Sequence, residues 1–225
     1  MMWRNSLAFV CTCLYMSLVQ LTFTRNYWST NFRISQVADT MPLNKFEELK
    51  RFLHFSDNSI EDQDKIKIRP LVEQLRARYK TVPMEEQLSI DEQIVPVKER
   101  SCLRQYNPKK PHKWGYKLWV LCGRSGYAYD FQIYTGKADN TMLDGEEDFG
   151  ASGNVVVCFS RSIPCRVNHK LFFDNYFTSP DLQVYLAKKG ILCVGTARAN
   201  RIPQCPLKSE DQMKKKMKKL LLSTA

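Results

Sequence analysis

The spacing of apolar residues changes at Pro83, and this change limits the folds open to the chain. Before Pro83, apolar residues recur at helical spacing, as Phe46, Leu49 and Phe52 do. After it the spacing falls to two, and residues 127–136 alternate as a half-buried strand does. We therefore expect a helical segment over residues 1–83, followed by a sheet.

Three signals refine the helical segment. Asn44 and Glu47 form a capping-box pattern at the start of one helix. Residues 56–65 are polar and rich in turn formers, which predicts a loop. A second helix then begins with Pro70 in its first turn, where the missing N–H of proline costs nothing.

The first 23 residues have two interpretations. Arg4 followed by an apolar run is typical of a signal peptide. However, polar residues interrupt the run, no small-residue cleavage site follows, and the uninterrupted apolar length is short for a membrane span. We expect a buried helix here, and a cleaved or membrane segment is the alternative.

The second part of the chain is predicted to consist mainly of strands, with helical segments between them. Strands are expected over residues 88–97, 116–122, 127–136, 170–175 and 191–197. The apolar run 154–163 suits either a buried strand or a helix. A further helix has Ser179 as its cap, Pro180 at its first position and Gly190 at its end. This order predicts an α/β protein with a mixed, RNase H-like sheet over residues 84–200.

Charge and cysteine usage narrow the class of partner. The net charge of +11 favours a polyanion, nucleic acid first, although a basic domain without such a partner has the same charge. Residues 201–225 form a lysine-rich tail, which is either a nuclear-localisation patch or a frayed end. The eight cysteines form no CxxC pair and have no zinc spacing with the three histidines, so we expect no zinc and a reducing compartment.

Two aspartates are candidates for metal binding. Asp91 lies in the first predicted strand of the sheet, and Asp174 lies at the end of the fourth. Adjacent strands can bring both carboxylates to one edge, where they would bind Mg²⁺ through oxygen and support phosphodiester cleavage. Glu92 is a poor third ligand because neighbouring strand residues point to opposite faces. The alternative is that Asp91 is a polar strand residue and Asp174 a turn residue.

A basic segment over residues 97–117 is the candidate nucleic-acid contact. It has seven positive charges against one acid, Glu99. Tyr106, Trp114 and Tyr116 are interspersed with them, which suits phosphate contact together with stacking on unpaired bases. The alternative is a solvated loop with Trp114 and Tyr116 packed in the core. The candidate DNA-binding residues are Lys98, Arg100, Arg104, Lys109, Lys110, Lys113 and Lys117.

Taken together, the motifs resemble those of piggyBac transposases, and most closely the domesticated piggyBac transposable element-derived proteins. The resemblance runs from about Cys13 to about Met213. It rests on the ordered series RNYWST, FEELKRFLHFSDN, LSIDEQIVPVK, YNPKKPHKWGYKLWVLC, FFDNYFTSPDL and GILCVGTARANR.

The resemblance implies a DDE/D-type DNA recombinase with an RNase H-like core. Such enzymes cut DNA with a metal-activated water and join the freed 3′-OH to target DNA. Asp91 and Asp174 match the family's first and second catalytic aspartates. The resemblance also makes residues 154–163 a helix. The family's third catalytic aspartate lies well beyond Arg201 and is not matched here, and neither is its cysteine-rich zinc module.

From these observations we expect a truncated, domesticated piggyBac-type fragment in the nucleus, with residual DNA binding and an incomplete catalytic triad. Two carboxylates without the third would leave Mg²⁺ poorly held, so independent strand transfer is not expected. One alternative is a metal-dependent enzyme that still nicks and joins DNA. The other is a non-enzymatic protein that associates with a full-length relative or with itself. No membrane partner is expected.

Overall fold

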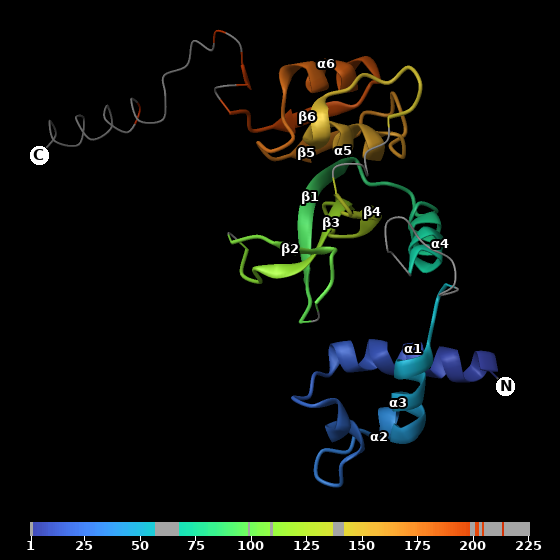
Figure 1. Cartoon of the computed structure of the whole chain (residues 1–225). Coiled ribbons are helices and arrows are strands. Elements are labelled where there is room, and N and C mark those ends of the chain that lie inside the picture. Colours follow the sequence, from blue (N-terminus) through green and yellow to red (C-terminus); the bar gives the residue numbers. More distant parts are fainter. Residues whose placement is uncertain are drawn as a thin grey trace, which may run out of the picture. The chain divides into compact units, whose positions relative to one another are not determined.

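The computed structural model describes residues 2–56, 68–98, 100–108, 110–136 and 142–198, with residues 201, 202, 204 and 213 (Figure 1). Most of the predicted loop at 56–65 and nearly all of the lysine-rich tail therefore lie outside the described residues. Contacts divide the chain into two compact units. The first contains helices α1 to α3, and the second contains most of helix α4 and every later element.

An aromatic cluster between helices holds the N-terminal unit together. The unit consists of α1 (Met2–Leu18), the 3-10 helix η1 (Thr24–Trp28), α2 (Ser35–Ala38) and α3 (Leu43–Phe52). The ring centroid of Phe46 on α3 lies 5.0 Å from that of Phe9 on α1 and 5.2 Å from that of Trp28. Contacts of this kind between aromatic rings add to the apolar area that they bury, so this unit has a small core of its own.

Helix α1 is covered on one side only. Phe9 is buried, whereas Leu7, Leu14 and Leu18 are exposed. The predicted N-terminal helix is present, but the expectation that it is buried is wrong, because the small core of this unit reaches only one stripe of the helix. Among the described residues, no helix has the length and hydropathy that crossing a bilayer requires.

The predicted cap of α3 is also wrong. The helix begins at Leu43, and its N-cap residue is Pro42, which makes no side-chain capping hydrogen bond. Asn44 therefore lies inside the first turn. The extended backbone of Pro42, with ψ of 146°, lets the helix start two residues before the position that the capping-box pattern indicated.

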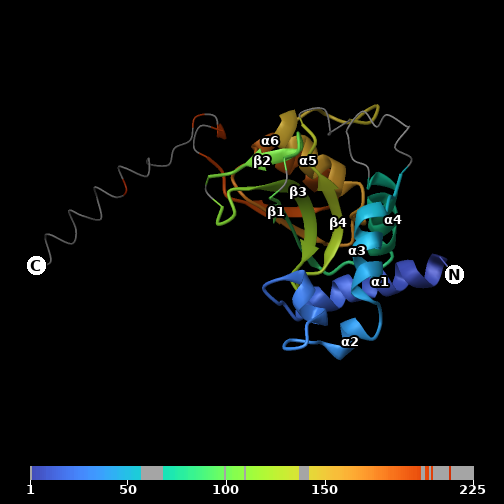
Figure 2. The same ribbon diagram turned by 60° about the horizontal axis from the view of Figure 1, so that its bottom comes forward.

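The second unit is built on a mixed sheet. Its strands are β1 (Gln87–Pro96), β2 (Arg104–Tyr106), β3 (Trp114–Gly123), β4 (Ala128–Ile133), β5 (Lys170–Phe173) and β6 (Leu192–Gly195). They lie in the order β2-β3-β1-β5-β6, and β4 also pairs with β3. Strand β3 is antiparallel to β1, β2 and β4, whereas β5 is parallel to β1 and β6. The predicted α/β class, helices followed by a mixed sheet, is confirmed, and Figure 2 shows β1, β3 and β4 side by side.

One face of this sheet packs against helices. Leu88 and Ile90 of β1 belong to a buried cluster with Val156 of α5 (Gly150–Ser160) and Leu186 of α6 (Pro180–Lys188). The residues that alternate with them point to the other face, where Phe172 of β5 and Val194 of β6 are exposed. Strands β1, β5 and β6 thus present a covered face and an open face.

Helix α6 follows its sequence signals closely. The Ser179 hydroxyl oxygen accepts a hydrogen bond from the Leu182 N–H, Pro180 occupies the first turn, and Gly190 ends the helix with a φ of +75°.

Helix α5 resolves the ambiguous run 154–163. Its residues 153–160 are all buried, so the run has no polar side from which a helical period can be read.

Strand β2 was not predicted. It lies inside the basic segment 97–117, and strand β3 starts at Trp114, two residues earlier than predicted. Its three residues, Arg-Gln-Tyr, contain no apolar alternation, so nothing in the local pattern indicates a strand. Pairing with β3 creates it, and together they form a ribbon.

Candidate active site and nucleic-acid interface

Parallel strands bring the two candidate aspartates together. Asp91 lies within β1, and Asp174 directly follows β5. Because Ile90 pairs with Phe173, the two aspartates occupy the next position along each of the two neighbouring strands. Both side chains are exposed, and both line one hollow of about 490 Å³ on the open face of the sheet.

Backbone N–H groups orient both carboxylates. The Glu92 N–H donates to Oδ1 of Asp91 at 2.7 Å, and the Tyr176 N–H donates to Oδ1 of Asp174 at 2.8 Å. The second contact is an Asx turn, and the Thr178 hydroxyl closes it by donating to the Asp174 carbonyl oxygen at 2.8 Å. Within the part of the chain that the structure describes, no hydrogen bond reaches Oδ2 of either aspartate.

This arrangement fits part of a divalent-metal site. Exposed carboxylate oxygens are the ligands that Mg²⁺ prefers, and each aspartate has one oxygen that its backbone contact leaves available. Over the described ranges, no group of three or more His, Cys, Asp or Glu side chains is arranged to hold a metal ion. The aspartate pair therefore fits as two ligands of such a site.

Lys117 lies beside this pair in an aromatic cage. Its Nζ is 3.8 Å from the ring centroid of Trp119, 5.4 Å from that of Tyr176 and 3.8 Å from the Glu92 carboxylate. Burial lowers the pKa of the Lys117 ammonium, and the negative charge of Glu92 opposes that effect, with smaller contributions from Asp91 and Asp174. Lys117 is thus an internal cation near the aspartates.

The aromatic cage also supports the turn that carries Asp174. Trp119 on β3 is buried and stacks on Tyr176 with ring centroids 5.8 Å apart, and it meets Phe177 edge-on at 5.3 Å. Sequence reasoning did not assign these residues to the site. Two aromatic residues directly after the acidic turn were the available signal, but their partner lies far away in the sequence.

The structure divides the seven predicted DNA-binding residues into different environments. Lys98, Arg100 and Lys113 are exposed. Arg104 lies over the Trp114 ring, 4.5 Å from its centroid. Lys110 lies 3.6 Å from the Glu92 carboxylate, and Lys117 occupies the cage described above. Lys109 lies outside the described residues. A smaller set than the seven thus faces solvent.

Comparison with known proteins decides the family. Residues 6–225 match the family described as Transposase IS4. Human PiggyBac transposable element-derived protein 3 is 35% identical over 199 residues, and human PiggyBac transposable element-derived protein 2 is 32% identical over 198 residues. The chain belongs to the piggyBac-derived, IS4-type DDE transposases. The family expected from the sequence motifs is confirmed.

These piggyBac-derived relatives are much longer than this chain. Each alignment covers 85% of this chain but 33% of the relative, so the chain spans about a third of the length of the curated relatives it matches. The chain is also similar in fold to a solved structure, the cryo-EM structure of a piggyBac transposase synaptic complex with hairpin DNA. The TM-score is 0.76 at 23% identity, covering 92% of this chain and 45% of that one. This likeness concerns the fold.

Proposed function

We propose that this chain is a DNA-binding piggyBac-derived domain that contributes two carboxylates, Asp91 and Asp174, to a metal site but does not perform strand transfer alone. One observation carries the proposal: the two exposed aspartates meet on adjacent parallel strands of the same sheet that bears the basic β2–β3 ribbon. DDE transposases typically use a divalent metal ion, and the structural neighbour is a transposase complex with DNA.

The exposed cations of the ribbon support DNA binding. Lys98, Arg100 and Lys113 are exposed, and Arg104 is partly so. Exposed cations of this kind bind phosphates and release condensed counterions from the DNA. This contribution to binding does not depend on the DNA sequence. The exposed rings of Tyr106 and Trp114, on neighbouring strands of the same ribbon, add apolar contact area for nucleic acid.

Salt dependence tests this part of the proposal. Raising salt from about 50 to about 200 mM is expected to weaken DNA affinity roughly 50-fold, because about three or four phosphate contacts each release counterions. The measurement is fluorescence anisotropy with a labelled duplex. Replacing Lys98, Arg100 and Lys113 by Ala should abolish most of this dependence, whereas replacing the exposed Arg78, Arg124 and Lys188 should change it little. An affinity that does not change with salt contradicts the proposal.

A DNA-nicking enzyme is the second candidate, favoured by the hollow that Asp91 and Asp174 line together. A bound Mg²⁺ would supply Lewis-acid activation of a phosphodiester and of the attacking water. The residues of this chain would hold that ion through Oδ2 of each aspartate, with the Glu92 and Tyr176 N–H groups fixing both side chains. Two ligands orient a metal ion weakly, which is why we rank this candidate second.

A nicking assay separates the two candidates. With supercoiled plasmid and Mg²⁺ or Mn²⁺, we expect the wild type, Asp91→Ala and Asp174→Ala to show the same background of open circles. The exposed Asp181→Ala serves as the matched control. If the wild type and Asp181→Ala nick the plasmid and both Asp91→Ala and Asp174→Ala do not, the chain is a DNA-nicking enzyme and the ranking above is overturned.

A further inference from the structure

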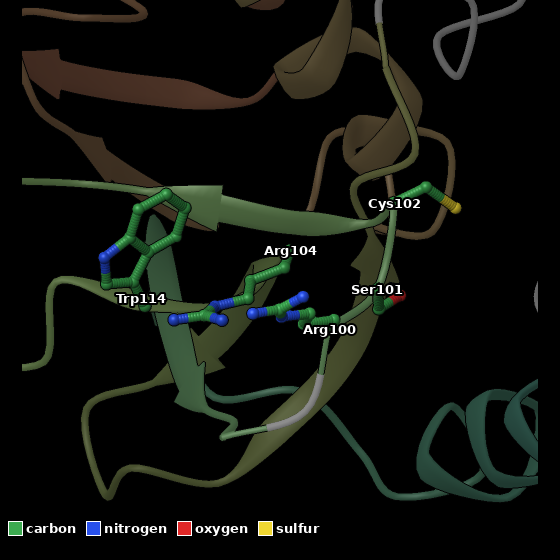
Figure 3. Close-up of a pocket in the computed structure, with 5 residues that line it drawn as sticks. All are labelled: Arg100, Ser101, Cys102, Arg104 and Trp114. Carbon is green, nitrogen blue, oxygen red and sulfur yellow. The ribbon is translucent and has the colours of Figure 1, made fainter.

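The β2–β3 ribbon contains a hollow separate from the aspartate pair. It has a volume of about 360 Å³ and is lined by Arg100, Ser101, Cys102, Arg104 and Trp114 (Figure 3). Its volume falls at the lower end of the range of about 300–1,000 Å³ typical of sites for small ligands. The hollow therefore suits one small group rather than the side of a duplex.

A tight turn builds the hollow. The Ser101 hydroxyl oxygen accepts a hydrogen bond from the Leu103 N–H at 3.3 Å, and the Arg104 N–H donates to the Ser101 carbonyl oxygen at 3.2 Å. This turn reverses the chain just before β2, so that the side chains of Arg100 and Arg104 extend toward the same space (Figure 3). Stacking on Trp114 holds the Arg104 guanidinium at 4.5 Å from the ring centroid.

The charge of the hollow favours a phosphate. Two guanidinium groups line this one small hollow, so an anion bound in it would lie near two positive charges. Guanidinium is planar and donates in a fork that matches two phosphate oxygens, which a lysine ammonium does not.

The rim of the hollow favours a base with a free face. Trp114 is 47% exposed and Tyr106 is 53% exposed, and their ring centroids lie 4.7 Å apart. Exposed aromatic rings of this kind are stacking platforms for nucleic-acid bases. Inside a duplex each base is already stacked between its neighbours, whereas an unpaired base can offer a face to these rings.

We propose that this hollow binds one unpaired nucleotide of DNA, with its phosphate on Arg100 and Arg104 and its base against Trp114 and Tyr106. The inference rests on the DNA binding proposed above and adds a preference within it. The chain binds single-stranded DNA, or duplex with an unpaired end, more tightly than fully paired duplex of the same sequence.

Anisotropy titrations of the full chain test this preference with one labelled oligonucleotide, used single-stranded, fully paired, and paired with an unpaired 3′ tail. Arg100→Ala is expected to weaken binding of the single strand and the tailed duplex about tenfold, and of the paired duplex about twofold. The larger loss is expected where an unpaired nucleotide enters the hollow, because only there does the Arg100 guanidinium bind a phosphate through two hydrogen bonds. Trp114→Leu is expected to weaken the first two about tenfold through lost stacking. Arg100→Lys should restore duplex affinity but only part of single-strand affinity.

Lys98→Ala is the matched control, since it removes one exposed charge from the same segment outside the hollow. It should weaken binding of all three DNA forms equally. Superimposable thermal melts establish that the variants are folded. If Arg100→Ala and Trp114→Leu weaken all three forms equally, the nucleotide pocket is wrong while DNA binding stands. If no form binds at low salt, both proposals fail.

Discussion

Replacement of Asp130 by Ala is expected to lower the free energy of unfolding by about 3 kcal/mol. The carboxylate is buried, with 2% of its side chain exposed, and it binds Nε of Arg76 at 2.6 Å and Nζ of Lys80 at 2.9 Å. It also accepts the Phe131 N–H at 2.8 Å. Loss of the carboxylate leaves the Arg76 and Lys80 cations without their counter-charge. Because 28% of the Arg76 side chain and 38% of the Lys80 side chain are exposed, hydration of both cations reduces the loss of stability.

Urea unfolding followed by circular dichroism measures this change. The exposed Asp144→Ala should remain within about 0.5 kcal/mol of the wild type. Adding Arg76→Met to Asp130→Ala should recover part of the loss, because it removes one of the stranded cations. A loss below about 1 kcal/mol for Asp130→Ala would mean that this contact does not anchor α4 to β4.

Replacement of Trp119 by Ala is expected to destabilise the second unit by about 3–5 kcal/mol. Trp119 is 3% exposed, and its ring contacts Tyr134, Tyr176 and Phe177. The Ala variant leaves a cavity between β3 and the turn after Asp174, and it removes the ring on which the Lys117 ammonium rests. Trp119→Ala is therefore expected to disturb the surroundings of Asp91 and Asp174 as well as the core.

Trp119→Phe is the informative comparison. The indole N–H of Trp119 has no hydrogen-bond acceptor among the described residues. The Phe variant therefore loses side-chain volume but no hydrogen bond. We expect it to cost about 1–2 kcal/mol, clearly less than the Ala variant. Equal losses for the two variants in chemical denaturation would show that ring packing is not what Trp119 contributes.

Local signals in the sequence determined the parts of the fold that depend on near neighbours. The cap, first-turn proline and terminal glycine of α6 all act within one turn, and the sequence predicts each of them. The strand predicted over residues 127–136 is present as β4, but the predicted alternation is wrong, because the register with β3 shifts between Leu121 and Cys122, and Tyr129 and Asp130 are both buried. Asn44 shows the limit of such signals, because the extended backbone at Pro42 places the helix start two residues before the one that the capping box predicts.

The elements that sequence reasoning missed depend on distant partners. Strand β2 exists only because β3 pairs with it, and the fully buried α5 lacks the polar side that would reveal its period. The same holds for the charges. Lys110 and Lys117 were predicted to contact DNA. In the structure both lie near the Glu92 carboxylate on β1, and Lys117 also packs on the Trp119 ring on β3.

For the candidate site, the sequence alone determined the residue types, and tertiary structure decided their arrangement. Motifs singled out Asp91 and Asp174, and charge clustering singled out the segment that includes Arg100 and Arg104. That the aspartates lie side by side follows from the parallel pairing of β1 with β5, which are separated by more than seventy residues in the chain. That two arginines share a hollow with Trp114 follows from a turn and a strand pairing. Long-range hydrogen bonding and burial act only in the folded chain, so no local pattern could carry this information.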